Sequence, residues 1–143
     1  MVLLDSDGLI ASVKPDDVFH AKAQKIIAFL TEKDIPLGIA TSTIAEVITT
    51  IDRRFHRRDL ASKLYLKLVS GWAQIFAVDE QIVKKANTLF ANSKSKKNTI
   101  FDSINVVVSQ KYNIETLFSF DKWYRKQKLV LIDDLIHKDF SSN

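Results

Sequence analysis

The sequence predicts an α/β fold, a single three-layer domain whose central, mostly parallel β-sheet is flanked by helices. Short apolar runs, typical of buried strands, alternate along the chain with longer segments whose apolar residues recur at helical spacing. Strands separated by helices favour a parallel sheet with helices on both faces. The chain has 143 residues with only 3 glycines and 2 prolines, and it shows no repeat and no linker. We therefore expect one domain over residues 1–143.

The first half of the chain is expected to hold strands at 2–4 and 35–40, and helices at 17–30, 44–51 and 60–69. The first strand is apolar and stops at Asp5. Asp16 and Asp17 are suited to cap the first helix, whose apolar face includes Val18. Gly71 marks the end of the third helix.

The second half of the chain is expected to hold strands at 72–78, 116–120 and 129–132, and helices at 80–90 and 100–112. Asp79 is suited to cap the first of these helices. The polar, basic stretch at 92–98 is typical of a loop. The phenylalanines that fit apolar faces, and that we expect in the core, are Phe19, Phe29, Phe55, Phe76, Phe90, Phe101, Phe118 and Phe120.

Four acidic residues lie at element ends that can share one edge of the predicted sheet. Asp5 and Asp121 follow strands. Glu46 lies early in the helix after the second strand, and Asp102 begins the helix after the basic loop. Ligands of parallel sheets bind at the carboxyl ends of the strands, and carboxylates gathered there repel unless a cation neutralises them. Oxygen ligands without Cys or His select Mg²⁺ or Mn²⁺, ions that activate water for phosphodiester hydrolysis.

Each acid also has a purely structural interpretation. Glu46 completes the capping-box pattern Thr43-x-x-Glu46, and Asp102 suits the positive end of a helix dipole. Asp5 and Asp121 suit caps or turns. For any single acid the structural role is favoured. Four caps that fall on one edge would be a coincidence, so we favour a metal site formed by all four.

The segments that carry these acids resemble the successive motifs of PIN-domain ribonucleases, namely LLDSDGLIA, STIAEVITTI, TIFDSINVVVSQKYN and LFSFDKWYRK. They come in the family's order and span nearly the whole chain. The length and the single domain are similar to those of VapC toxins from VapBC toxin–antitoxin pairs. The resemblance implies a PIN-like fold and a metal-dependent endoribonuclease. Such an enzyme hydrolyses RNA with a metal-activated water and forms no covalent intermediate.

The resemblance also implies roles for individual residues. Asp5, Glu46 and Asp102 match the acids that carry the metal and the catalysis. Asp121 matches the fourth acid, and Ser42 matches a hydroxyl that completes the polar cluster. The expected cofactor is Mg²⁺ or Mn²⁺.

Two positions depart from the family pattern. Trp123 stands where many members have a further acid, and Asp7 stands where Asn is common. Asp7 is an extra carboxylate that is expected to support the site or the fold. The resemblance further implies a homodimer, an RNA substrate and an antitoxin that covers the cleft.

Basic residues are expected to guide RNA to the acids. Setting the four acids apart from the 17 acidic residues leaves 13, against 21 basic residues. Lys94, Lys96 and Lys97 directly precede Asp102 and are candidate RNA contacts. A second cluster follows Glu46, where RNA and partner binding both stay open: Arg53, Arg54, His56, Arg57 and Arg58. The structural alternative for both clusters is a solvated surface.

Composition excludes several other classes of protein. The absence of cysteine excludes a disulfide framework, a thiolate metal site and a cysteine nucleophile. No apolar run reaches the ~20 residues that a membrane span needs. The N-terminus lacks the pattern of a signal peptide, so we expect a cytoplasmic protein without membrane contact.

Two other functions are compatible with parts of the sequence. Asp5-Ser6-Asp7-Gly8 resembles the DxDG opening of haloacid dehalogenase-like phosphatases, in which the first Asp is a nucleophile. In that alternative Thr41 would bind phosphate, and Asp133-Asp134 would follow the last strand. The usual Thr after DxDG is Leu9 here, which counts against it. The second alternative is a non-catalytic RNA-binding or partner-binding domain, whose RNA binding would not depend on metal.

Overall fold

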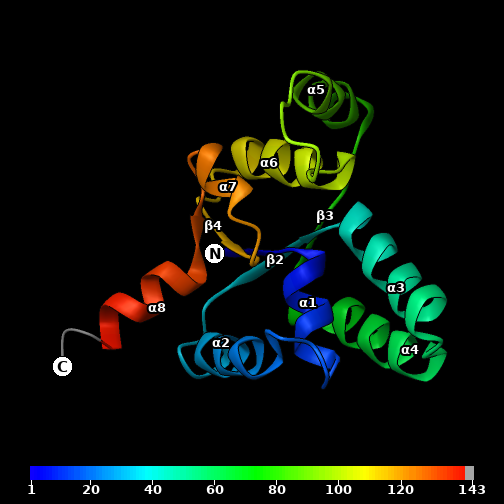
Figure 1. Ribbon diagram of the computed structural model, residues 1–143, viewed down its shortest axis with the longest axis vertical. Coiled ribbons are helices and arrows are strands. Elements are labelled where there is room, and N and C mark those ends of the chain that lie inside the picture. Colours follow the sequence, from blue (N-terminus) through cyan, green and yellow to red (C-terminus); the bar gives the residue numbers. More distant parts are fainter. Residues whose placement is uncertain (141–143) are drawn as a thin grey trace.

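The computed structural model describes residues 1–140, with side chains as far as Ile136. Five parallel strands form one sheet in the order β3-β2-β1-β4-β5 (Figure 1). The strands are β1 Val2–Leu4, β2 Leu37–Ala40, β3 Gln74–Phe76, β4 Thr116–Phe118 and β5 Val130–Leu131. The predicted three-layer α/β fold is therefore confirmed.

Helices cover both faces of the sheet (Figure 1). One layer consists of α1 Ser6–Val13, α2 His20–Glu32, α3 Thr41–Phe55, α4 Arg58–Lys67 and α8 Ile132–Phe140. The other layer consists of α5 Glu80–Ala91, α6 Ile100–Tyr112 and α7 Trp123–Lys126. A π-helical turn, η1 Leu68–Trp72, follows α4 and leads into β3; Gly71 in this turn has a φ of 92°, which an L side chain rarely adopts. Among the described residues, no helix has the length and apolar character that crossing a membrane would require.

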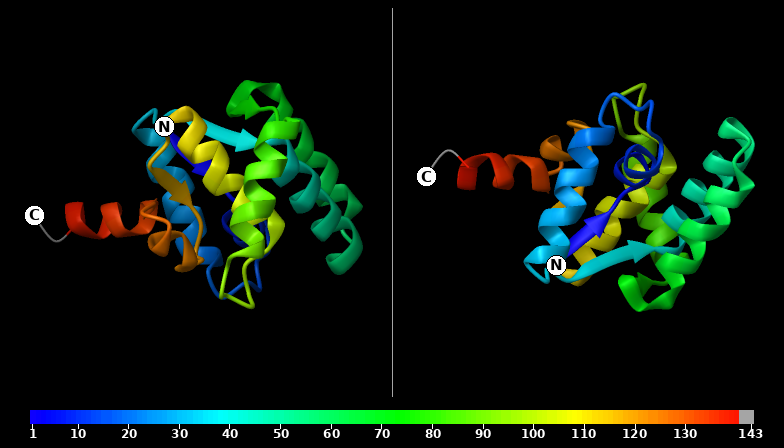
Figure 2. Two further views of the ribbon diagram at one scale, coloured as in Figure 1. Left: turned by 90° about the horizontal axis from the view of Figure 1, so that it is seen from above. Right: turned by 90° about the horizontal axis from the view of Figure 1, so that it is seen from below.

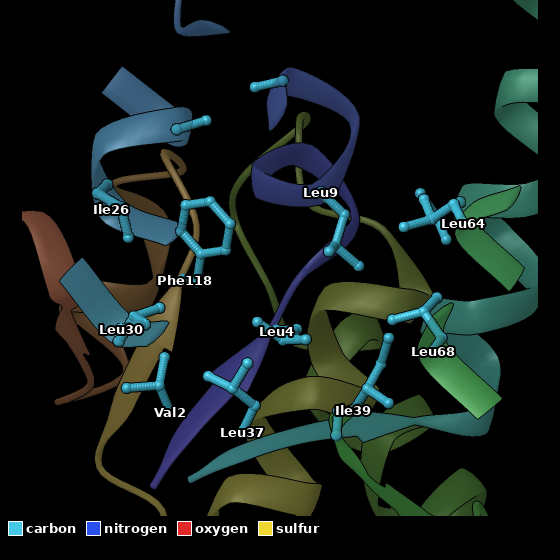
Figure 3. Close-up of a cluster of buried hydrophobic side chains, with 14 of the residues drawn as sticks. Val2, Leu4, Leu9, Ile26, Leu30, Leu37, Ile39, Leu64, Leu68 and Phe118 are labelled. Carbon is cyan, nitrogen blue, oxygen red and sulfur yellow. The ribbon is translucent and has the colours of Figure 1, made fainter. Parts of the chain in front are cut away.

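The alternation of side chains along the strands divides the core into two layers. In β1, Val2 and Leu4 pack with α1 to α4, whereas Leu3 packs with α5 to α7. Figure 3 shows the first of these layers, in which Leu9 of α1 lies next to Leu4, and Leu64 of α4 lies further out, on the side of Leu68. Each fully buried leucine contributes roughly 1.5–3 kcal/mol, so the centre of the sheet is a rigid base for its carboxyl edge.

Glycine allows α1 to lie close to the sheet. A Cβ at Gly8 would stand only 2.6 Å from the carbonyl oxygen of Phe118 in β4. A side chain at this position would push α1 away from the strand. The first turn of α1 is thereby held directly beside the end of β4.

The observed elements differ from the prediction near the N-terminus. Helix α1 was not expected; it begins directly after β1 because the Asp5 carboxylate accepts a hydrogen bond from Ser6 N and caps it. The next helix begins at His20, not after Asp17. The Asp17 carboxylate accepts instead from Phe19 N and forms a turn, which leaves Val18 91% exposed. The expected burial of Val18 is therefore wrong.

The prediction also differs at the C-terminus and for two aromatic residues. The last strand has only two residues, because α8 begins at Ile132. Asp133 and Asp134 lie in the first turn of α8, where negative charge is stabilised by the positive end of the helix dipole. Phe19 and Phe90 are 43% and 41% exposed, so these rings do not lie in the core as expected.

Candidate active site

Asp5 is buried at the carboxyl end of the central strand. The residue is only 2% exposed. Its Oδ1 accepts hydrogen bonds from Ser6 N at 2.8 Å and from Asn105 Nδ2 at 2.9 Å. Its backbone N donates to Phe118 O, which ties it to the end of β4. Figure 2 (right) shows the β1 arrow pointing toward the edge of the sheet where this residue lies. The predicted position of Asp5 is thus the position observed.

Asn105 of α6 links Asp5 to two other helices, α3 and α7. Its Oδ1 accepts a hydrogen bond from Thr43 Oγ1 of α3 at 3.0 Å, and its Nδ2 also donates to Tyr124 Oη of α7 at 3.3 Å. Tyr124 Oη in turn donates to Asp102 Oδ1 at 3.2 Å. Asn105, Thr43 and Tyr124 are all fully buried. This chain of hydrogen bonds fixes the relative positions of the two aspartates.

Asp102 helps to cap α6, the structural role that its position suggested. The cap uses only one of its two carboxylate oxygens. It forms a capping box with Thr99, in which Thr99 N donates to Asp102 Oδ2 and Asp102 N donates to Thr99 Oγ1. The other oxygen, Oδ1, accepts from Tyr124. The cap therefore orients the carboxylate so that one oxygen faces the buried network.

Glu46 and Ser42 lie one turn apart on α3, at a spacing that places both on one helix face. Glu46 Oε2 and Ser42 Oγ are buried and have no hydrogen-bond partner in the described part of the chain. The capping box Thr43-x-x-Glu46 is not formed, because α3 begins at Thr41 and the Thr43 hydroxyl bonds Asn105 instead. Two buried oxygens are thus left without a structural function.

Asp7 holds the backbone of two segments together. Its Oδ1 accepts from Gly8 N at 2.6 Å and its Oδ2 accepts from Phe120 N at 2.8 Å. Because both oxygens are bonded to backbone N–H groups, Asp7 supports the site by joining α1 to the segment after β4.

Asp121 lies where β4 leads into α7. Its Oδ1 accepts from Trp123 N at 2.8 Å, and its backbone N donates to Ser119 Oγ at 3.1 Å. Trp123 is 8% exposed and packs edge-on against Tyr124, with ring centroids 5.5 Å apart. The tryptophan therefore extends the core beneath the site.

The pKa values show that these carboxylates lie within electrostatic reach of one another. Burial raises the pKa of Asp5 well above its usual value, and the charges of Asp7 and Asp102 raise it further. Burial also raises the pKa of Asp7. Burial raises the pKa of Asp102, with a further contribution from the charge of Asp121. The pKa of Glu46 rises to about 7, chiefly through burial and then through the charges of Asp102 and Asp7.

The side chains of the site supply the oxygen ligands that a hard cation prefers, but they are not gathered closely enough to enclose one. Within the part of the chain whose side chains are described, no three Asp, Glu or His side chains are gathered tightly enough to hold a metal ion as they stand. Two observations nevertheless fit a divalent cation: Glu46 Oε2 and Ser42 Oγ are unpartnered and buried, and four carboxyl pKa values are raised. An oxygen-only donor set of this kind suits Mg²⁺ or Mn²⁺.

The two basic clusters have different surroundings. Lys94, Lys96 and Lys97 are exposed in the loop that leads into α6, at the same end of α6 as Asp102. In the arginine cluster, Arg57 forms an ion pair with Asp59, and Arg58 forms one with Asp52. These arginines lie at the far end of α3 from Ser42, so they are remote from the acids along the helix.

Sequence reasoning identified the acids but missed the residues that connect them. Asn105 and Tyr124 each lie three positions after an acid, Asp102 and Asp121. For Asn105 this spacing was an available signal, because residues three apart share a helix face. Ser6 and Ser119 were also missed; the Ser6 side chain lowers the pKa of Glu46 and the Ser119 side chain lowers the pKa of Asp5, against the larger effect of burial.

A parallel sheet in this order, with acids at its carboxyl edge, defines a class of α/β proteins with a polar site at that edge. The sequence profile of the PIN domain matches residues 2–128. The chain therefore belongs to the PIN-domain family. Among curated proteins, no sequence matches this chain.

Several solved structures share the fold, and VapC20 and FitAB are two of them. VapC20 of Mycobacterium tuberculosis, a sarcin–ricin loop cleaving toxin, superposes with a TM-score of 0.81 at 16% identity, over 91% of this chain and 97% of VapC20. FitAB bound to the IR36 DNA fragment superposes with a TM-score of 0.63 at 14% identity, over 92% of this chain and 93% of that chain.

The residues of the phosphatase alternative are engaged elsewhere. Both oxygens of Asp7 accept backbone hydrogen bonds, and Thr41 Oγ1 accepts from Val78 N. Asp133 pairs with Lys22, and Asp134 pairs with Arg125. Together with the family match, these contacts leave no support for that alternative.

Proposed function

We propose that this protein is a metal-dependent endoribonuclease that acts as the toxin of a toxin–antitoxin pair. The observation that carries the proposal is the group of electrostatically coupled carboxylates at the carboxyl edge of a PIN-domain sheet, with two buried oxygens left unpartnered. Asp5, Glu46, Asp102 and Asp121 would hold Mg²⁺ or Mn²⁺, and Ser42 would support them. A bound ion of this kind supplies an activated water and neutralises charge on the phosphate.

The chain itself contributes orientation and charge. The Asn105–Tyr124 hydrogen bonds hold Asp5 and Asp102 in place, so the carboxylates need little reorganisation when the cluster is neutralised. Burial keeps Glu46 partly protonated near pH 7, so cation binding there releases a proton. Asp7 ties the first turn of α1, which Asp5 caps, to the segment after β4.

RNA is the proposed substrate, and the lysine loop is its proposed first contact. Lys94, Lys96 and Lys97 are exposed beside the N-terminus of the helix that carries Asp102. Cations next to an acidic site allow a polyanion to approach it, in a strongly salt-dependent manner. VapC20 is a sarcin–ricin loop cleaving toxin, which supports structured RNA as the substrate class.

A cognate antitoxin, a homodimer and a cytoplasmic location complete the proposal. The structural likeness to VapC20 and to FitAB supports a toxin–antitoxin system. An antitoxin gene adjacent to this one, whose product suppresses toxicity on co-expression, is the expected genetic result. If no such gene suppresses the activity, the toxin role fails while the nuclease role stands.

The decisive experiment measures cleavage of end-labelled structured RNA by the purified protein with Mn²⁺ and with EDTA. Cleavage is expected only with the metal. Asp102→Asn should reduce the rate by at least about 100-fold, the scale on which loss of a positioned catalytic or electrostatic group acts. Asn can still accept the Thr99 hydrogen bond, so the helix cap is retained.

Asp79→Asn is the matched control. Asp79 also caps a helix, α5, and its carboxylate is exposed and paired with Lys111. Its replacement should leave cleavage unchanged. If EDTA and Asp102→Asn both leave cleavage intact, the acids are structural. RNA binding that is indifferent to metal, with no scission, would instead support the non-catalytic RNA-binding alternative.

A further inference from the structure

Phe19 and Phe120 form an aromatic pair at the margin of the hydrophobic core, against which Phe120 packs as a partly buried ring. Their rings are stacked, with centroids 4.4 Å apart and planes inclined by 11°. Phe120 also contacts Phe118 edge-on, at 6.0 Å between centroids, so the pair is anchored to β4. Phe19 nevertheless remains 43% exposed. A large apolar ring fixed in place at the surface offers a ready contact to a ligand.

The pair lies at the carboxyl edge of the sheet, beside the acids. Phe120 directly precedes Asp121, and its backbone N donates to Asp7 Oδ2 at 2.8 Å. Figure 2 (right) shows the connection between α1 and α2, which carries Phe19, and the loop between α5 and α6 at this same edge. In Figure 1 these two connections belong to opposite helical layers. The acids therefore lie between the lysine loop on one side and the phenylalanine pair on the other.

We propose that the Phe19–Phe120 pair is a subsite for one nucleobase of the RNA substrate, on which an unpaired base stacks. This inference rests on the proposed nuclease function and extends it to single-stranded loops or bulges. Proteins recognise such RNA by stacking splayed bases on aromatic rings, since every base has a π-face. A strand held by the lysine loop would cross the acids and place its next unpaired base on Phe19.

The charged groups next to the pair have both signs: Asp17 accepts a hydrogen bond from Phe19 N and Asp121 follows Phe120, whereas Lys122 is a cation that can meet a phosphate. Lys122 follows Asp121 directly; it is exposed and forms no ion pair within the described part of the chain. A free cation two residues from Phe120 can meet a phosphate while the ring meets the base. A base stacked on an aromatic ring with a cation next to its phosphate is a common arrangement in single-strand binding sites.

The test measures RNA binding in the Asp102→Asn background, so that cleavage does not complicate the result. The probe is a fluorescent single-stranded RNA of randomised sequence, and the readout is anisotropy at fixed salt. Phe19→Ala should weaken binding by about 5- to 100-fold, the range found when one stacking ring is removed. Phe19→Trp should restore binding, whereas Phe19→Leu, which is apolar but has no π-face, should not.

Val18→Ala is the matched control, because Val18 is a neighbouring apolar residue that is 91% exposed. It should bind RNA like the parent protein. Binding by Phe19→Leu at the parent level would overturn stacking. Unchanged binding by Phe19→Ala would overturn the subsite and leave the pair as a surface for a protein partner.

An abasic scan of a defined RNA keeps the proposal testable if Phe19→Ala is unstable. In an RNA chosen for cleavage by the parent protein, removal of one base near the scissile bond should weaken binding to Asp102→Asn. The same removal should cost nothing further in the Phe19→Leu background, because Leu retains apolar bulk and the two changes delete one contact. Additive losses at every position would overturn the inference. Metal-dependent cleavage that survives Phe19→Ala at full affinity would reject the subsite alone, whereas absence of cleavage by the parent would reject the nuclease.

Discussion

Asn105 is the residue through which most of the site's geometry is transmitted. Its amide hydrogen-bonds to Asp5, Thr43 and Tyr124, and it is fully buried. We expect Asn105→Ala to lower the free energy of unfolding by about 2–3 kcal/mol, because it leaves buried polar partners unsatisfied. It should also weaken Mn²⁺ binding, since Asp5 loses a restraint. Chemical denaturation and Mn²⁺ titration measure the two effects.

Ser109→Ala is the control for this variant. Ser109 lies one turn further along α6, is equally buried, and its hydroxyl has no partner among the described residues. Its removal should leave stability unchanged or slightly higher, because it deletes a buried hydroxyl that makes no hydrogen bond. Equal effects of the two variants would show that Asn105 has no special structural role.

Tyr124 provides a pH-dependent test of the same network. Its hydroxyl donates to Asp102 Oδ1 and thereby lowers the pKa of that carboxyl, although burial keeps the pKa raised overall. Tyr124→Phe removes the donor and retains the ring, so the pKa of Asp102 should rise further. The acidic limb of the pH–rate profile for RNA cleavage is then expected to move to higher pH.

Tyr112→Phe serves as the comparison, because Tyr112 stacks against Phe76 and is 40% exposed. Its pH–rate profile should overlay that of the parent. A Tyr124→Phe profile that also overlays the parent would mean that the hydroxyl does not tune Asp102.

At this scale the sequence indicated which acids lie together but not how they are held. The acids were predictable because strand ends meet at one edge of a parallel sheet. The contact between Asn105 and Asp5 joins residues 100 positions apart, and it depends on how α6 packs against the sheet. Asp7 illustrates the same limit, because only the fold shows that both its oxygens are occupied by backbone groups.

The loop between α5 and α6 is the element expected to govern the salt dependence of RNA binding. Replacing Lys94, Lys96 and Lys97 by Gln should weaken binding and flatten the plot of log affinity against log salt. The slope should fall by about 0.7 for each phosphate of the single strand that a lysine no longer neutralises. Filter binding over a salt series in EDTA measures the slope.

The control replaces exposed lysines away from that loop, namely Lys25, Lys33 and Lys63. It removes the same total charge from α2, its C-terminal end and α4. Its slope should remain near the parent value. An equal change in both triple variants would indicate that net charge, and not the loop, governs binding.

Helices with a clear capping residue or a regular recurrence of apolar residues could be predicted from the sequence. Elements whose ends depend on packing or pairing with other elements could not. Helices α5 and α6 were predicted closely, because Asp79 caps α5 and apolar residues recur along α6. Helix α1 was missed because its eight residues include Gly8 and follow the strand without a break. Strand β5 was predicted too long, since its end is set by pairing with β4 over two residues.

The whole molecule should be more stable at pH 5 than at pH 8 when metal is absent. Asp5, Asp7, Glu46 and Asp102 all bind protons more tightly in the folded protein than in the unfolded chain. Stability from such groups is complete below the unfolded pKa and is lost as pH rises through the folded pKa. For Glu46 this stability is lost between pH 4.5, the ordinary pKa of the group, and about pH 7, its pKa in the folded protein.

Thermal melts followed by circular dichroism in EDTA at pH 5 to 8 measure this trend. Glu46→Gln should reduce the fall in melting temperature over that range, because it removes one of the titrating groups. Addition of Mn²⁺ should raise the melting temperature most at pH 8, where the carboxylates are ionised. A melting temperature that rises steadily from pH 5 to pH 8 in EDTA would contradict the assigned pKa shifts.

The order of strands in the sheet also determines at which stage of synthesis the candidate site can form. Strand β1 precedes the other four strands in the sequence yet lies at the centre of the sheet, and one of its two neighbours is β4, with Val2 opposite Thr116. The residues that surround Asp5 in the folded protein are therefore absent until most of the chain has been translated. Such long-range closure is slow to form. A growing chain of this topology would stay inert on the ribosome until synthesis has passed β4, which leaves time for an inhibitor made alongside it to bind as the site closes.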